Sequence, residues 1–141
     1  MNLKTKFFDE IQCAKEDLIH FIYGLPGFQD YHDFVIINED DESPIYFMQS
    51  VDEKNLCFLI TSPYSVVDQY TIELSDEVVD NLKIEQEDDV AIYTILNTHS
   101  KNNQITANMI CPLIVNTKNH LAGQGMINNT HYQLRQSVCS T

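Results

Sequence analysis

Residues 46–61 read YFMQSVDEKNLCFLIT and contain two short apolar runs with a polar stretch between them. The first run is Tyr46–Ser50 and the second is Leu56–Thr61, whereas Asp52–Asn55 has no apolar side chain. Short runs of aromatic and aliphatic residues that end at polar turn residues are typical of β-strands. This stretch therefore predicts two strands joined by a short polar connection.

The same pattern recurs along the whole chain. Further strands are predicted at residues 3–8, 11–13 and 18–22, Phe34–Asn38, Tyr70–Leu74, Val90–Leu96, Ile105–Ile110, Leu113–Val115, Gly123–Ile127 and Tyr132–Val138. A single open sheet with this many strands would expose long edges, and closure of the sheet removes them. We therefore predict an all-β, mainly antiparallel fold, a closed or partly open barrel-like sheet with one or two short helices.

One segment predicts a helix. Ser75 is a suitable N-cap, and Asp76 and Glu77 after it carry negative charge that favours the positive end of a helix. The apolar residues that follow share one helical face: Val78, Val79 and Leu82. We expect this short helix to plug one end of the barrel.

The remaining organisation is simple. A chain of 141 residues fits one domain, and its polar linkers are too short to mark a boundary, so residues 1–141 are predicted to form a single domain. No apolar run approaches the roughly 18 residues that a membrane-spanning helix needs. The N-terminal MNLKTK leads into acidic residues rather than an apolar core, unlike a signal peptide. We expect a cytoplasmic protein.

The charge balance is strongly acidic. The chain has 21 Asp and Glu against 8 Lys and Arg, which gives a formal net charge of −13. Direct nucleic-acid binding is disfavoured because it depends on Lys and Arg that neutralise phosphates. A basic protein partner would be attracted and steered by such a charge. Acidity also keeps a protein soluble, so charge alone does not decide between a docking role and solubility.

Two runs of carboxylates stand out as candidate partner-binding residues. They are Glu39, Asp40, Asp41 and Glu42, and then Glu85, Glu87, Asp88 and Asp89. Neither run contains the glycine that a calcium-binding loop requires for its turn. Each run is interpreted either as solvated loop charge or as a docking patch for a basic partner.

No motif for catalysis, cofactor binding or metal binding is evident. The cysteines are far apart and form no CxxC pair, which disfavours zinc: Cys13, Cys57, Cys111 and Cys139. Cys57 lies in an apolar run and is expected to be a small buried residue, and the roles of the other three stay open. No strained elbow that aims a nucleophile is present. We predict no enzyme, no cofactor and no metal, although carboxylate chemistry created by the fold stays open as an alternative.

Several motifs follow one another in a recognisable order. Residues 24–28 read GLPGF, residues 47–52 read FMQSVD and residues 106–116 read TANMICPLIVN, with Gly123 and Gln124 behind them. Together these motifs resemble those of the FliW family of flagellar assembly factors and cover nearly the whole chain. Four positions depart from the family pattern: Phe8, Met109, Cys111 and Gly125.

These motif residues also have structural interpretations. The segment Gly24–Phe28 is predicted to be a tight turn with Phe28 packed inward. Asn108 and Asn116 are expected to bond local backbone at strand ends. The motifs therefore do not locate a partner surface by themselves.

The resemblance implies a function in partner switching. FliW-like proteins bind the translational regulator CsrA and keep it from repressing flagellin mRNA, while flagellin competes for the same protein in a chaperone-like exchange. The expected partners are CsrA and flagellin, with no direct nucleic-acid contact and no membrane. Alternatives are a flagellin export chaperone without a role in translation, and a small carboxylate-based hydrolase or ligand-binding barrel. The oligomeric state and the face used by each partner stay open.

Overall fold

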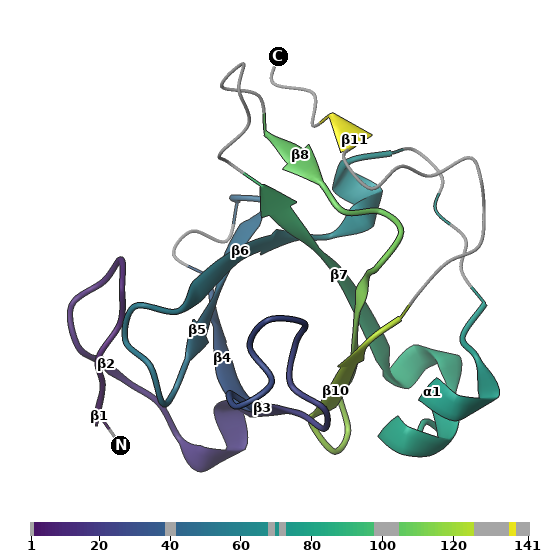
Figure 1. Cartoon of the computed structure of the whole chain (residues 1–141), viewed down its shortest axis with the longest axis horizontal. Helices are drawn as coiled ribbons and strands as arrows, with labels where there is room; N and C mark the ends of the chain where they lie inside the picture. The colour runs from purple at the N-terminus through teal and green to yellow at the C-terminus, as the bar shows by residue number, and fades with distance from the viewer. Residues whose placement is uncertain are drawn as a thin grey trace.

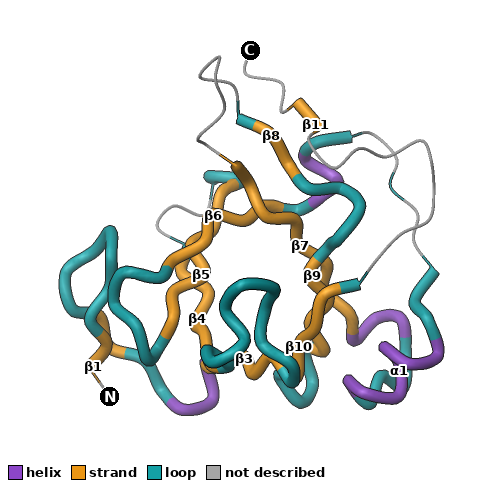
Figure 2. The backbone as a smooth tube through the Cα atoms, viewed as in Figure 1, coloured by secondary structure: helices purple, strands orange, loops and turns teal. Residues whose placement is uncertain are grey.

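The computed structural model describes residues 2–38, 42–67, 70, 73–97 and 105–125, and the backbone of 136–137. A closed barrel dominates the fold, and the view in Figures 1 and 2 looks through its ring of strands. Its strands are β3 (Leu18–Phe21), β4 (Asp33–Ile37), β5 (Ile45–Ser50), β6 (Cys57–Thr61), β7 (Val90–Asn97), β9 (Leu113–Asn116) and β10 (Leu121–Gln124).

The pairing around the barrel runs β7-β6-β5-β4-β3-β10-β9, and β9 pairs with β7 to close the ring. Each of these pairings is antiparallel except that between β10 and β3, which is parallel. The prediction of an all-β, mainly antiparallel barrel is therefore confirmed.

Shorter elements decorate the barrel. They are β1 (Asn2–Leu3), β2 (Ile11–Gln12), β8 (Thr106–Ala107), β11 (Gln136–Ser137), the 3₁₀ helices η1 (Lys15–Asp17), η2 (Pro63–Ser65) and η3 (Glu87–Asp89), and the helix α1 (Asp76–Leu82). The strands β1 and β2 form a separate two-stranded ribbon. Strand β8 pairs with the end of β7 on one side and with β11 on the other. No helix in the described part of the chain is long and apolar enough to cross a membrane.

The barrel interior follows from the period of two in each strand. Alternate side chains of a strand point to the same face, so every second residue enters the core. The fully buried residues of this core include Phe21 of β3, Phe34 of β4, Met48 of β5, Ile60 of β6 and Leu113 of β9. The residues between them face outward, where the β1–β2 ribbon covers β4 and the segments around η2 and β8 cover β7.

Some predicted strands were wrong in extent. Of residues 3–8 only Leu3 lies in a strand, because the Thr5 side chain bonds Phe8 and holds a bend. The prediction Ile105–Ile110 shrinks to β8, because Asn108 Oδ1 accepts hydrogen bonds from the next turn. The described residues of Tyr70–Leu74 are not in a strand, and the Tyr70 side chain instead donates a hydrogen bond to the Met109 carbonyl.

The last two predicted strands lie partly outside the described residues. In the first, β10 begins earlier than expected, at Leu121, because Leu121 and Ala122 pair with β3. In the second, Tyr132–Val138, the described part is β11.

The barrel end is closed differently from our expectation. Helix α1 lies outside the ring beside β10, so the prediction that it plugs the barrel was wrong (Figure 1). The connection between β3 and β4 instead spans the opening in this view, and its Leu25 is only 2% exposed and packs in the barrel core. Phe28 stays partly exposed, although its ring contacts Phe58. Leu25, rather than Phe28, is thus the inward anchor of this turn.

The predicted helix itself is confirmed. Ser75 Oγ accepts a hydrogen bond of 3.2 Å from the Val78 N–H, which caps the first turn of α1. The helix ends at Leu82 because Lys83 adopts a left-handed conformation with φ of 55°. Leu82 is the buried residue of the helix and faces Gly123 of β10, so α1 is fixed to the outer wall of the barrel.

Candidate partner-binding surface

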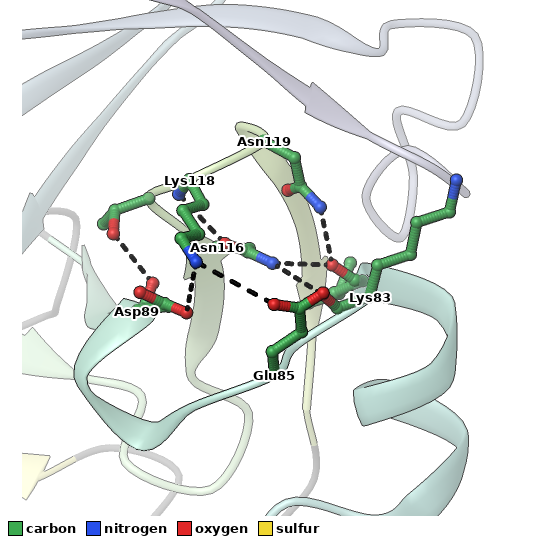
Figure 3. Close-up of polar contacts among 8 residues, drawn as sticks. Lys83, Glu85, Asp89, Asn116, Lys118 and Asn119 are labelled. Carbon is green, nitrogen blue, oxygen red and sulfur yellow. Dashed lines mark hydrogen bonds and ion pairs between the residues drawn. The ribbon is translucent and has the colours of Figure 1, made fainter.

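The second acidic run connects α1 to β7, and its four carboxylates have different surroundings. Lys118 Nζ lies 3.8 Å from Glu85 Oε2 and 4.0 Å from Asp89 Oδ2, between the two side chains (Figure 3). The Asp89 side chain is only 15% exposed, and its carbonyl accepts bonds from the Thr117 N–H and hydroxyl. Asp89 is therefore mainly a structural residue of the predicted run.

The other members of this run remain available to a partner. Glu85, Glu87 and Asp88 are exposed to solvent. Glu85 shares Lys118 with Asp89, and an ion pair between exposed groups is worth little. Three of the four predicted carboxylates are thus exposed, and the fourth, Asp89, is largely buried.

The amide of Asn116 holds this region together. Its Nδ2 donates to the carbonyls of Leu82 at 2.9 Å and Lys83 at 3.2 Å, and its Oδ1 accepts from the Lys118 N–H at 2.9 Å (Figure 3). Asn119 Nδ2 adds a bond of 3.1 Å to the same Leu82 carbonyl. The expected local backbone bond of Asn116 is therefore present, but its bonds to α1 were not foreseen. They fix the helix end, and hence the start of the acidic run, against the β9–β10 connection.

The first acidic run is described only at its last residue. Three of its four residues fall outside the part of the chain that the structure describes: Glu39, Asp40 and Asp41. The fourth, Glu42, is exposed just before β5. Ile45 at the start of β5 pairs with Thr61 at the end of β6, and Thr61 pairs with Thr94 in the middle of β7. Two strand pairings, β5 with β6 and β6 with β7, therefore lie between the strand that follows Glu42 and the strand that follows Asp89.

Two groups on the barrel have shifted pKa values. Burial raises the pKa of the Cys57 thiol to about 11, and the nearby Lys6 offsets only part of this effect. Burial also raises the pKa of Tyr93, with a further contribution from Tyr46. Cys57 is half-buried rather than fully buried, yet its thiol stays protonated at neutral pH, where it is a poor nucleophile. No metal-binding cluster of His, Cys, Asp and Glu occurs among the described residues.

A groove between α1 and β10 was not predicted. Its volume is about 350 Å³, and its lining residues come from three separate segments, namely the residues after β3, helix α1 and strand β10. Short apolar stretches in each segment are also expected of ordinary core residues. The sequence therefore does not indicate the groove, which forms only when the fold brings the three segments together.

The comparisons with known proteins agree with one another. The FliW protein family matches residues 2–138 of the chain. A flagellar assembly factor FliW of Alkaliphilus metalliredigens (strain QYMF) is 37% identical over 139 residues, which cover 98% of this chain and 86% of that protein. Another from Clostridium novyi (strain NT) is 35% identical over 138 residues, 98% of this chain and 96% of the relative. A crystal structure of the flagellar assembly factor FliW superimposes with a TM-score of 0.89 at 31% identity and covers 97% of this chain and 96% of its own.

Proposed function

The chain belongs to the FliW family of flagellar assembly factors, and from this premise we propose that it binds the translational regulator CsrA and prevents CsrA from repressing flagellin mRNA. The observation that carries the proposal is the exposed carboxylate group of Glu85, Glu87 and Asp88, held on the rigid frame around Asn116. A regulator that binds RNA carries basic residues, which such a surface attracts.

The charge of the whole chain strengthens the attraction. With a net charge of −13, the protein repels RNA but draws a basic partner toward it over several ångströms. The bonds of Asn116 to the Leu82 and Lys83 carbonyls, and of Thr117 to the Asp89 carbonyl, hold the two ends of the acidic run and so reduce the ordering that binding would otherwise require. Long-range attraction and a pre-ordered surface together favour fast association.

Flagellin is the proposed competing partner, and the exchange takes place in the cytoplasm. When flagellin accumulates it occupies this protein, CsrA is released, and flagellin synthesis stops. The flagellin contact is expected to use an amphipathic helical segment, so its affinity depends more on buried apolar area than on charge. The protein therefore acts as a chaperone-like switch rather than as an enzyme.

A reconstitution tests the proposal. The purified chain is immobilised, binding of a purified CsrA-type protein is measured by biolayer interferometry, and flagellin monomer is then added. We expect a complex that flagellin displaces, and release of flagellin leader RNA from CsrA when the chain is added. Binding to flagellin without binding to the CsrA-type protein would contradict the proposal and support the export-chaperone alternative.

A further inference from the structure

The groove between α1 and the barrel wall is apolar at its base. Its apolar lining residues are Ile22 after β3, Val78 and Leu82 of α1, and Ala122 of β10. Its volume of about 350 Å³ lies at the lower end of the range found for ligand-binding clefts. Its apolar lining suits an aliphatic side chain of a partner, and its volume leaves room for the neighbouring residues of the same segment.

Glycine in β10 leaves this space open. Gly123 lines the groove, and a Cβ atom at this position would lie 3.7 Å from the Leu82 side chain, an ordinary contact distance. Gly123 does not have a left-handed backbone conformation, so a larger residue can be placed there without backbone strain. The groove can therefore be narrowed experimentally by a single substitution.

The rim of the groove is aromatic and acidic. Tyr23 lines it and is 68% exposed, and Glu77 of α1 lies on the same groove and is also exposed. Residues 73–89, all of which the structure describes, contain eight Asp or Glu side chains and one basic residue, Lys83. Glu77 is the acidic residue that lines the groove, and the exposed carboxylates Glu85, Glu87 and Asp88 follow α1 in the sequence.

From this juxtaposition we infer that the groove receives one aliphatic side chain from a lysine- or arginine-rich segment of the basic regulator. The inference rests on the proposed function, because it takes the same partner and names the contact. The charge of the rim selects this occupant: a segment with lysine or arginine beside its aliphatic residue would neutralise Glu77 and its neighbours, whereas an uncharged or acidic segment would not. The buried side chain would slow dissociation, and the acidic rim would speed association.

Two substitutions test the groove separately from the charge. Gly123→Val adds methyl groups to the groove, and Tyr23→Ser removes the exposed aromatic ring that lines it. The matched control is Tyr64→Ser, which removes another exposed tyrosine ring, on η2. We expect each groove variant to raise the dissociation rate of the CsrA-type protein about tenfold, with little change in association rate. The control should bind like the parent protein. Circular dichroism and urea unfolding verify that each variant is folded, and Tyr23→Ser keeps the test valid if Gly123→Val does not fold.

The outcomes separate this inference from the proposed function. If the parent protein does not bind the regulator, both are overturned. If the parent protein binds and the two groove variants dissociate at the parental rate, the inference alone is overturned. Loss of flagellin binding with regulator binding intact would assign the groove to flagellin, and self-association that only the groove variants abolish would assign it to a second copy of the chain, so either result overturns the inference.

Discussion

Replacement of Asn116 by alanine tests the frame that supports the acidic run. The side chain is 1% exposed and makes three hydrogen bonds, to the carbonyls of Leu82 and Lys83 and from the N–H of Lys118. A typical hydrogen bond contributes about 1 kcal/mol net, and a buried group left without its partner costs about 1–3 kcal/mol. The Leu82 carbonyl keeps its bond from Asn119, which limits the loss. We therefore expect the free energy of unfolding to fall by about 2–3 kcal/mol.

Urea unfolding followed by circular dichroism measures this change. The matched control is Asn119→Ala, which removes an amide from the same turn that donates to the same Leu82 carbonyl at 3.1 Å. Because Asn119 is exposed, water replaces its bonds, and we expect a loss of under about 1 kcal/mol. Amide hydrogen exchange should also show α1 opening more readily in Asn116→Ala than in Asn119→Ala. Equal stability losses in the two variants would refute the role assigned to Asn116.

Three further changes have distinct expected results. Gly24→Ala should lower the free energy of unfolding in urea more than Gly27→Ala does. Both glycines have positive φ, but a Cβ on Gly24 would lie 2.7 Å from the Gln29 backbone, whereas a Cβ on Gly27 would have no atom within 4 Å. Iodoacetamide should alkylate Cys57 much more slowly at pH 8 in the folded protein than in urea. The pKa of Cys57 is about 11 in the folded protein and 9.0 ordinarily, because burial favours the neutral thiol. The stability that the neutral Cys57 thiol contributes is therefore full below about pH 9 and is lost as the pH rises toward 11. Lys118→Met removes the cation between Glu85 and Asp89, so it should speed association with the CsrA-type protein in stopped-flow measurements, and slower association would contradict the electrostatic account.

Strands that coincide with a short apolar run between polar turn residues could be predicted from sequence, and segments whose conformation depends on distant contacts could not. The runs around Phe34, Met48 and Ile60 are apolar on both faces, because their side chains pack alternately in the barrel core and in the clusters outside it. Tyr70–Leu74 has the composition of a strand, but its described residues form none, and the Tyr70 hydroxyl donates to the Met109 carbonyl instead. Such a contact depends on a residue far away in the chain, so local composition does not reveal it.

The candidate surface was predictable only in part. The acidic run after α1 is visible in the sequence, but the sequence does not show that Asp89 differs from the exposed carboxylates. That difference depends on Thr117 and Lys118, which the pairing of β7 with β9 brings next to Asp89. The groove likewise joins three distant segments. Sequence patterns describe neighbours along the chain, whereas these features are made by neighbours across the sheet.

The most direct test of the account is the association rate with a CsrA-type protein as a function of salt. One variant carries Glu85→Gln, Glu87→Gln and Asp88→Asn, and a control of equal net charge carries Glu10→Gln, Glu16→Gln and Asp30→Asn, which are exposed carboxylates outside the proposed surface.

For the parent protein we expect salt to slow association about tenfold or more as the screening length falls to about 8 Å at physiological ionic strength, with a much smaller effect on dissociation. The first variant should associate more slowly than the control at low salt and depend less on salt. Association rates that are insensitive to salt and equal in the two variants would contradict the central claim that this acidic surface draws in the basic regulator.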